Sequence, residues 1–522
     1  MPAAPGRAGP GRRPWGTDPA HRRTDPRRHG GAAMSSSALR GRERLRPERP
    51  AWAAASEPLV RRPLPLVTRE AVARPVTGAT NARLVQRNMN WNADKWPPAM
   101  AELRERGAAI RRETLRDLEG YLRRLTERVE EHGGRVHRAT TPDDARRIVG
   151  EIARDGDVRL AIKSKSMVSE EIELGPYLEE HGVEVVETDL GEYIVQLADE
   201  RPGHIIAPAI HKSRADIHDL FERLGGERLP DAPEQLAAFA RRRLRDDFHG
   251  ADMGISGVNF ACADTGTLVT VTNEGNARMV TSQPRIHVAV MTLEKVIPRF
   301  TDLGVLVPLL SHAATRQRVS VYQTMVTGPR RPGEADGPEE LHLIILDNGR
   351  SRIPGTQYEE VLACIRCGAC QVACPVFRTV GGGHAYNAVY GGPIGAVLTP
   401  LIGDQEEGAD LPFLSSLCGA CYDACPVKIP LPDMLVDLRA DYERRHRGPA
   451  RVGWAAWSRL WGSPLGYRAS LLGGRLAGLL PGGLVGRTAS LARSWSRGRD
   501  VPPLRAAGAF RRWFRSHRGE PG

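Results

Sequence analysis

The sequence predicts an α/β domain followed by a smaller α-helical module that is rich in cysteine. Candidate strands and helices alternate through the first region, which is typical of a largely parallel α/β sheet. Seven of the eight cysteines lie in two short runs of the second region, and Cys262 lies alone. Four segments are expected: a disordered basic extension (1–80), the α/β domain (81–347), the α-helical module (348–446) and a basic, Trp- and Arg-rich C-terminal region (447–522).

The first and last segments are strongly basic. Residues 1–50 contain 12 arginines and 4 acidic residues, and residues 444–522 contain 16 arginines and 2 acidic residues. The net charge of the whole chain is only +12, so the region between them is acidic. Basic tails can bind nucleic acid, anionic lipid or acidic partners. Only 6 of the 74 basic residues are lysine, which favours the coding bias of a GC-rich genome, and no nucleic-acid partner is expected.

The α/β domain is expected to begin with a helix over residues 97–132. Leu115, Leu118, Leu122 and Leu125 recur at three- and four-residue steps, with charged residues between them. This spacing places the four leucines on one face of a helix, which is typical of an amphipathic helix that packs on a core.

Strands and further helices follow in alternation. Thr141 precedes Pro142 and is expected to be the N-cap of a helix. Another helix is expected near 168–181. Short β-rich runs predict strands at 159–162, 183–187, 204–207, 267–272, 286–291 and 342–347.

The polar stretch Lys163-Ser164-Lys165-Ser166 lies between a predicted strand and a predicted helix. Ligands of α/β sheets bind at such junctions, and the N-termini of helices attract anions. Alternation along an extended chain places Lys163 and Lys165 on one face, where they are expected to be surface lysines. The stretch is therefore either a site for a carboxylate, a phosphate or a CoA ester, or ordinary turn chemistry.

Two further polar turns flank one predicted strand. Thr265 lies in an Asp-Thr-Gly-Thr sequence before the strand, and Asn273 and Glu274 begin an Asn-Glu-Gly-Asn sequence after it. Gly275 is expected to supply a positive φ to a tight turn there. Thr265, Asn273 and Glu274 are candidate ligand-binding residues, and ordinary turn chemistry is again the alternative.

Three other residues with reactive side chains are expected to be structural. Cys262 lies in an apolar run and is interpreted as an inert, buried thiol. His287 and His312 have no neighbours at metal-ligand spacing. No catalytic residue can be assigned from these positions.

The first cysteine run has the spacing C-x2-C-x2-C-x3-C-P, which is that of bacterial two-cluster ferredoxins. It consists of Cys364, Cys367, Cys370 and Cys374, followed by Pro375. In such a run the first three thiolates hold one cluster and the fourth reaches the other cluster. The sequence therefore predicts two iron–sulfur clusters of the 4Fe-4S type.

The second cysteine run is a shortened copy of the first, with Ser415 at the first position. The crossing rule assigns Cys364, Cys367, Cys370 and Cys425 to cluster 1, and Cys374, Cys418 and Cys421 to cluster 2. Cluster 2 thus lacks a fourth thiolate. Ser415, another side chain or water could replace it, or the cluster could contain three irons.

Zinc and disulfides are the alternatives to iron–sulfur clusters. Structural zinc sites usually take four ligands from two pairs, which triplet runs fit poorly. Disulfides belong to secreted chains, and no secretory signal is present. Clustered free thiols indicate a cytoplasmic protein, and no apolar run is long enough to predict a transmembrane helix.

The C-terminal region combines aromatic and basic residues. Five of the nine tryptophans lie in the last seventy residues: Trp454, Trp457, Trp461, Trp495 and Trp513. The favoured interpretation is a helical appendage that covers the cysteine module. The alternative is a docking surface for a partner subunit or for the inner face of the membrane.

Several stretches together resemble one known domain, the lactate-utilization (LUD) domain. They are 163–168, 187–194, 254–268, 271–276 and 286–291. The resemblance implies a fold similar to that of sugar-phosphate isomerases and CoA transferases. A LUD domain followed by Cys-Ile-Arg-Cys-Gly-Ala-Cys and by Gly391-Gly-Pro-Ile-Gly-Ala-Val resembles the lactate utilization protein B family, from about residue 80 to residue 445.

This resemblance implies a function in electron transfer. It implies that the chain is similar to the iron–sulfur subunit of a bacterial system that oxidises L-lactate to pyruvate. The implied partners are a cysteine-rich CCG-type subunit and a second LUD protein. In rival interpretations, the LUD domain is itself an enzyme or a binding domain for a small carboxylate or CoA ester, or the clusters sense redox state on a scaffold.

The stoichiometry of lactate oxidation adds one expectation. Lactate releases two electrons, whereas each cluster accepts one, so a flavin or a comparable two-electron acceptor is expected upstream of the clusters. The sequence contains no flavin fingerprint and no G-x-G-x-x-G phosphate loop.

Overall fold

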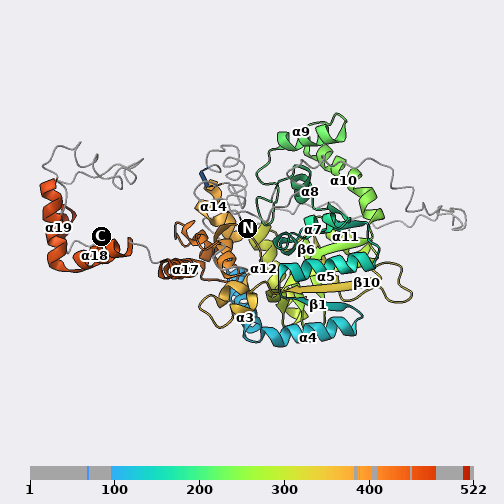
Figure 1. Cartoon of the computed structure of the whole chain (residues 1–522), viewed down its shortest axis with the longest axis horizontal. Coiled ribbons are helices and arrows are strands. Elements are labelled where there is room, and N and C mark those ends of the chain that lie inside the picture. Colours follow the sequence, from blue (N-terminus) through green and yellow to red (C-terminus); the bar gives the residue numbers. More distant parts are fainter. Residues whose placement is uncertain are drawn as a thin grey trace, which may run out of the picture.

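A six-stranded sheet lies at the centre of the first domain, in the order β1-β10-β7-β4-β2-β3 (Figure 1). This computed structural model describes residues 68–69, 96–200, 202–380, 386, 388–402, 408–446, 450–477 and 509–517. The strands are β1 (Arg135–Ala139), β2 (Leu160–Lys163), β3 (Glu184–Glu187), β4 (Met253–Gly257), β7 (Ile286–Thr292) and β10 (Glu340–Leu346). Apart from residues 68–69, the extension expected over 1–80 lies outside the described residues.

The predicted parallel sheet is confirmed, because all five pairings within it are parallel. Every residue of β7 is buried, and so are all residues of β10 after the first. Strands covered on both faces carry continuous apolar sequence, which is why these two were recognisable. The strands expected at 159–162, 183–187, 286–291 and 342–347 all lie within two residues of their expected bounds.

The stretch expected as a strand over 204–207 is instead a series of bends. Nδ1 of His204 accepts hydrogen bonds from the amides of Ile206 (3.0 Å) and Ala207 (3.1 Å), which curl the backbone. The side chains of this segment line a cavity that is described below. The prediction was wrong because apolar residues that suit a strand here form the wall of that cavity.

A second sheet has the order β8-β5-β6-β9. Its strands are β5 (Phe260–Cys262), β6 (Leu268–Thr272), β8 (Val296–Ile297) and β9 (Tyr322–Val326). Strand β6 confirms the strand expected over 267–272. Gly275 has a φ of −77° and is the N-cap of α11 (Asn276–Ser282). The expected positive φ was wrong, because the chain enters a helix after β6 and does not close a tight turn.

Two helices occupy the place of the single helix expected over 97–132. They are α3 (Pro98–Arg116) and α4 (Leu118–Glu131), and Asp117 between them has a φ of −137°, outside the helical region. All four leucines of the predicted stripe are buried. The apolar face was therefore predicted correctly, but the break was not.

The remaining helices of the domain follow the alternation. The predicted N-cap at Thr141 is confirmed, since Thr141 and Asp144 form a reciprocal capping box. The helix expected near 168–181 is divided at Glu173, which has a φ of 47°. These helices are α5 (Pro142–Asp155), α6 (Met167–Glu171), α7 (Leu174–Glu180), α8 (Leu190–Leu197), α9 (Arg214–Gly225), α10 (Pro233–Gly250) and α12 (Leu303–Thr315), with short 3-10 turns η2 (Leu293–Lys295) and η3 (Phe300–Asp302).

The second region is α-helical, as expected. Its elements are η4 (Arg350–Arg352), η5 (Glu359–Ala363), α13 (Ala369–Ala373), α14 (Pro375–Val380), α15 (Gly392–Leu398), η7 (Thr399–Leu401), η8 (Leu411–Phe413), α16 (Ala420–Ala424) and α17 (Leu431–Arg445). Helix α17 buries Leu435 and Leu438 in the core that also contains the cysteines. Tyr442, further along α17, packs against Phe413 with ring centroids 5.3 Å apart.

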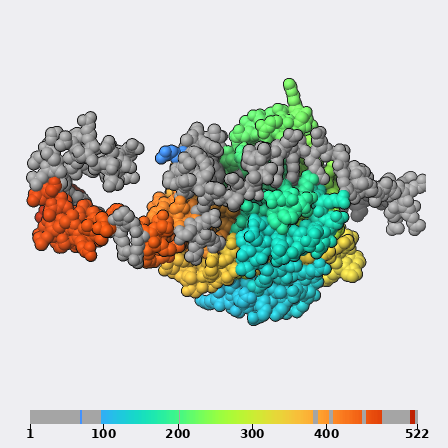
Figure 2. All heavy atoms as spheres, in the orientation of Figure 1, coloured from blue at the N-terminus to red at the C-terminus, as the bar shows by residue number. Residues whose placement is uncertain are grey.

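Three helices of the basic C-terminal region are described: α18 (Ala450–Gly462), α19 (Pro464–Ala477) and α22 (Ala509–Ser516). Figures 1 and 2 show α18 and α19 apart from the rest of the described chain. Trp454, Trp457 and Trp461 on α18 remain 66%, 49% and 47% exposed. For α18 and α19, the expected cover over the cysteine module was therefore wrong. Trp495 lies outside the described residues. None of the described helices is long and apolar enough to cross a membrane.

Candidate metal centre and the adjoining cavity

The two cysteine runs fold as copies of one another. Each run contains a residue at positive φ, Arg366 (60°) or Leu417 (55°), directly before a cysteine. A glycine at positive φ follows that cysteine, Gly368 (72°) or Gly419 (82°), and a one-turn helix begins after it. These two helices, α13 and α16, contact one another. The predicted internal repeat is therefore present in the backbone as well as in the sequence.

The copy extends to the position where the second run lacks a cysteine. In the first run, the amide of Arg366 donates to Sγ of Cys364 at 3.4 Å. In the second run, the amide of Leu417 donates to Oγ of Ser415 at 3.1 Å. The serine oxygen therefore occupies the place in its turn that the cysteine sulfur occupies in the other turn.

The four cysteines assigned to cluster 1 line one chamber. They are Cys364, Cys367, Cys370 and Cys425, and apolar residues such as Ile205 and Ile394 complete the wall. Cys367, Cys370 and Cys425 are buried, and Cys364 is partly buried. Burial raises the pKa of Cys425 to about 11. Buried thiols of this kind ionise only when a cation compensates them, so the donor set fits an iron–sulfur cluster.

The three cysteines assigned to cluster 2 form a second group. Cys374 and Cys421 are buried, whereas Cys418 is exposed. Burial, and then the charge of nearby Cys374, raises the pKa of Cys421 to about 12. A hydrogen bond from the amide of Ala420 lowers the pKa of Cys418. This group is therefore open to solvent on the Cys418 side.

Backbone amides surround the sulfur atoms. In addition to the hydrogen bond at Cys364, Sγ of Cys374 accepts a hydrogen bond from the amide of Phe377 at 3.5 Å. Sγ of Cys425 accepts one from the amide of Ile429 at 3.4 Å. Amide donors stabilise thiolate ligands and raise the reduction potential of a cluster. Among the described residues, no three His, Cys, Asp or Glu side chains converge as ligands of one metal ion would. A cubane differs from such a site because each thiolate binds a separate iron.

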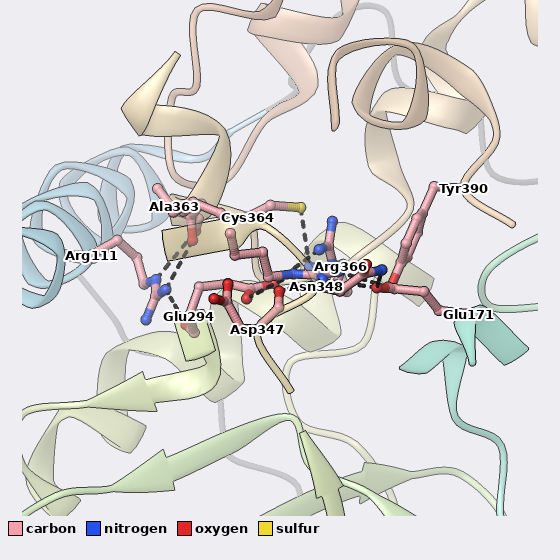
Figure 3. A network of polar contacts seen from close by, with 11 residues as sticks. Arg111, Glu171, Glu294, Asp347, Asn348, Ala363, Cys364, Arg366 and Tyr390 are labelled. Atoms are coloured by element: carbon pink, nitrogen blue, oxygen red, sulfur yellow. Dashed lines mark hydrogen bonds and ion pairs between the residues drawn. The ribbon is translucent and has the colours of Figure 1, made fainter. Parts of the chain in front are cut away.

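A buried network of charged side chains joins the α/β domain to the loop of the first cysteine run (Figure 3). Oε1 of Glu294, in η2, lies 2.9 Å from Nη2 of Arg366, and its Oε2 lies 3.3 Å from Nε of Arg350. Arg350 also pairs with Glu171 at 2.7 Å, and Glu171 accepts from the hydroxyl of Tyr390 at 2.5 Å. Burial alone would raise the pKa of Glu294, but the two arginines lower it to about 2.

Arg111 of α3 fastens the same junction through backbone atoms. Its guanidinium donates to the carbonyls of Val296 (2.9 Å), Leu362 (3.1 Å) and Ala363 (3.2 Å), and to that of Glu294. Leu362 and Ala363 directly precede the first cysteine, while Val296 belongs to the second sheet. The position of the first cysteine run is therefore fixed from the α/β domain.

A cavity of about 530 Å³ lies beyond the carboxyl ends of β2, β3 and β4. This is the edge at which parallel α/β sheets bind ligands. Four of the seven predicted ligand-binding residues line it: Lys165, Ser166, Asn273 and Glu274. Nζ of Lys165 donates to the carbonyl of Ile206 at 2.6 Å, and Oγ of Ser166 caps α6. Burial raises the pKa of Glu274.

The other three predicted residues do not line this cavity. Lys163 is 1% exposed and forms ion pairs with Glu187 and, at 2.9 Å, with Glu170. The expectation of a surface lysine was wrong, because Lys163 points into a cluster of buried carboxylates. Ser164 is also buried, and Thr265 donates to Thr267 at 2.9 Å.

Sequence reasoning missed other residues on the cavity wall. Lys295 is the last residue of η2, which follows β7, and Arg366 lies between Cys364 and Cys367. Burial, followed by the charge of Arg366, lowers the pKa of Lys295 to about 7. The sequence did carry a signal for Lys295, because it is a lysine that follows a strand of apolar residues. Asp189, which follows β3, also lines the cavity at this edge of the sheet.

Cys262, His287 and His312, which were expected to be structural, pack within the fold. Cys262 is fully buried, and burial raises the pKa of its thiol to about 12. His287 is buried with Nε2 at 2.8 Å from Oγ of Ser256, and burial lowers the pKa of its imidazole to about 4. The ring of His312 packs against that of Trp96.

Comparison with known proteins agrees with this organisation. Residues 122–346 match the LUD domain, and residues 360–429 match the 4Fe-4S dicluster domain. Lactate utilization protein B of Shouchella clausii is 44% identical over 425 residues, covering 80% of this chain and 89% of that protein. Lactate utilization protein B of Bacillus licheniformis is 44% identical over 430 residues, covering 81% and 89%.

Two other similarities complete the comparison. The uncharacterized electron transport protein YkgF of Escherichia coli is 40% identical over 455 residues, covering 85% of this chain and 92% of that protein. The crystal structure of a DUF162 family protein from Deinococcus radiodurans aligns with 44% of this chain and 98% of its own at 13% identity. Its TM-score of 0.25 is too low to carry an argument.

Proposed function

The chain belongs to the lactate utilization protein B family, and from this premise we propose that it relays electrons during the oxidation of L-lactate to pyruvate. It is an iron–sulfur subunit of lactate utilization with a 4Fe-4S dicluster domain. The observation that carries the proposal is that four cysteines from both runs line one chamber. A protein that holds two adjacent iron–sulfur clusters is suited to carry single electrons.

We assign Cys364, Cys367, Cys370 and Cys425 to cluster 1 and Cys374, Cys418 and Cys421 to cluster 2. The common chamber supports the first set. Proximity of Cys374 and Cys421 supports the second. The clusters, when bound, would accept and release one electron at a time. The protein's own part is to hold the sulfurs by the two repeated turns and to donate amide hydrogens to them.

The domain boundaries are proposed as follows: a basic extension (1–80), the LUD domain (81–347), the ferredoxin-like domain (348–446) and the basic C-terminal region (447–522). Within the LUD domain, we propose Lys165, Ser166, Asn273 and Glu274 as ligand-binding residues, because they line one cavity. Lys163, Ser164 and Thr265 do not line this cavity, so they could contribute to such a site only through the residues that do.

The protein acts within a lactate utilization system, and the partners proposed here are a cysteine-rich CCG-type subunit and a second LUD protein. Electrons would leave through the group that contains Cys418, because this cysteine is exposed. We further propose a cytoplasmic location with peripheral contact at the inner face of the membrane. The exposed tryptophans of α18, together with the arginines of the C-terminal region, support this contact.

Anaerobic reconstitution of the full chain tests the proposed function. Two clusters should give about seven to eight iron atoms per chain, and lactate should reduce them only when the partner subunits are present. Four or fewer iron atoms, or zinc retained in place of iron, would contradict the two-cluster assignment. Turnover of lactate by the isolated chain would instead make the LUD domain an enzyme in its own right.

A further inference from the structure

The large cavity and the chamber of cluster 1 are immediate neighbours. Ile205 and Arg366 line both spaces, so a single layer of side chains separates them. Arg366 belongs to the loop between Cys364 and Cys367. A molecule in the large cavity would therefore lie within electron-transfer reach of cluster 1.

Several buried polar groups on the wall of the cavity have no partner. Lys295 is 6% exposed and makes no hydrogen bond or ion pair with any residue that the structure describes. Nη1 of Arg366, Oγ of Ser311 and Oδ1 of Asn276 are buried without a partner as well. Buried polar groups of native proteins are almost always satisfied. Their presence around one cavity indicates a ligand that carries both acceptor and donor atoms.

The charges on the wall are not uniform. Lys295 and Arg366 lie together near Cys364, and Glu294 neutralises only the Nη2 edge of Arg366. The two carboxylates of the cavity are Asp189, which lies 3.8 Å from Nζ of Lys165, and Glu274. The region nearest the cluster therefore favours an anionic group, while the region near Glu274 favours hydrogen-bond donors.

The size of the cavity excludes lactate itself as the molecule that fills it. A volume of about 530 Å³ falls in the range of about 300–1,000 Å³ that is typical of sites for cofactors and drug-sized ligands. Isoleucines and valines form much of the wall, among them Ile194, Ile205 and Val258. An apolar body with a charged end matches this lining.

The proposed function narrows the chemistry further, and the present inference rests on it. Lactate gives up two electrons, whereas each cluster accepts one. The molecule beside cluster 1 must therefore be able to take up a pair of electrons and to release them one at a time. We propose that the cavity binds a redox-active organic anion of the flavin mononucleotide class, with its ionised phosphate against Lys295 and the free edge of Arg366. Quinones exchange electrons in the same way but lack the anionic group that this wall favours.

The electrons balance in this arrangement. A flavin that has taken two electrons and two protons from lactate, leaving pyruvate, returns to its oxidised form by releasing the two electrons singly. Cluster 1 accepts each electron in turn and passes it to cluster 2, while the two protons leave to water. No covalent bond between the protein and the flavin is required.

Titration of the anaerobically reconstituted full chain with flavin mononucleotide tests the proposal through quenching of flavin fluorescence. One flavin per chain should bind, and riboflavin, which lacks the phosphate, should bind more weakly. Lys295→Met should weaken flavin mononucleotide binding about tenfold or more and leave riboflavin binding nearly unchanged. Ala314→Phe, which fills part of the cavity from α12, should weaken both. Lys428→Met is the matched control, because Lys428 pairs with Glu105 away from the cavity.

The outcomes separate this inference from the proposed function. If the wild-type chain holds about seven to eight iron atoms but binds no flavin mononucleotide, the cavity assignment is overturned and the electron relay stands. If Lys295→Met binds the flavin as well as wild type but shifts the potential of cluster 1, the lysine compensates the cluster, and the proposed phosphate contact is wrong. Lactate or pyruvate bound at millimolar concentration, with no flavin bound, would likewise overturn it.

Discussion

Nη2 of Arg366 lies 2.9 Å from Oε1 of Glu294, and this ion pair is buried between the two domains. Arg366 stands in the turn that presents Cys364 and Cys367, whereas Glu294 follows β7 of the central sheet. The pair therefore connects the sheet of the LUD domain to the cysteines that we propose as ligands of cluster 1. Arg350 approaches the other oxygen of Glu294, so one carboxylate holds two buried arginines.

Removal of this carboxylate should damage both folding and cluster binding. Glu294→Gln leaves the buried guanidinium of Arg366 without its carboxylate partner and leaves Arg350 with Glu171 as its carboxylate partner, which should cost about 3–5 kcal/mol of unfolding free energy. Urea unfolding of the reconstituted protein measures the change, and iron content should fall with it. Glu151→Gln, which breaks the exposed Arg147 pair on α5, is the control and should have little effect. A variant at Glu294 that is as stable as this control would contradict the role of the network.

The crossed assignment of the cysteines can be tested one cluster at a time. Cys370→Ser should remove the low-temperature EPR signal of cluster 1, and Cys421→Ser should alter that of cluster 2. Loss of the same signal in both variants would mean that the two runs do not share their ligands in the crossed pattern. Cys262→Ser is the matched control and should change neither signal, because Cys262 lies in the core of the second sheet.

Ser415 offers a gain-of-ligand experiment. Its Oγ accepts from Leu417 as Sγ of Cys364 accepts from Arg366, so Ser415→Cys should place a fourth thiolate at cluster 2. The variant should lose iron more slowly in air than wild type, and the EPR signal of cluster 2 should shift. Ser463→Cys adds an exposed thiol between α18 and α19 and should produce neither change. Identical behaviour of the two variants would show that the turn at Ser415 does not face the cluster.

The carboxylates around Lys163 predict a dependence of stability on pH. Burial raises the pKa of Glu187 to about 7, and burial raises the pKa of Glu192 well above its usual range. Such groups hold protons that the unfolded chain releases above about pH 4.5, so stability should fall as pH rises towards 7. Glu192→Gln should make the unfolding free energy fall less between pH 5 and pH 7. Urea unfolding at both pH values measures it, and an unchanged slope would contradict the prediction.

The sequence was informative where one physical effect dominated. Continuous apolar runs identified β7 and β10, because both faces of these strands are covered. Strand β1 was missed because an edge strand exposes polar residues. Strand β4 was missed because it contains glycines, and a Cβ at Gly254 would lie 1.9 Å from the carbonyl of Val280.

The metal centre was more predictable than the cavity. Cysteine spacing is a local property, so the two runs could be recognised, and a crossed pairing predicted, before any fold was known. The cavity is assembled from segments that are far apart, and no local pattern marks Lys295 or Ser311 as neighbours of Arg366. Sequence reasoning identified Lys165 and Glu274 only because both follow predicted strands.

Lys163 and Lys165 show this limit most directly, since they were expected to share one face and one role. Lys163 is buried among Glu170 and Glu187, whereas Lys165 lines the cavity and is partly exposed. Lys163→Met should therefore cost about 3–5 kcal/mol of unfolding free energy, because it leaves buried carboxylates without their cation. Lys165→Met should cost only about 1 kcal/mol, the value of one hydrogen bond to a carbonyl.

The two substitutions should rank in the opposite order in their direct effect on activity, with Lys165→Met having the larger effect. Lys165→Met should retain the iron of wild type and nearly its melting temperature, but it should reduce lactate-dependent dye reduction by the assembled complex, because the lysine lines the cavity that the proposed ligand fills. Lys163→Met should lose activity only in proportion to the protein that remains folded. Full activity in a folded Lys165→Met variant would remove this lysine from the ligand site. Equal destabilisation by the two substitutions would contradict the different burial of the two side chains.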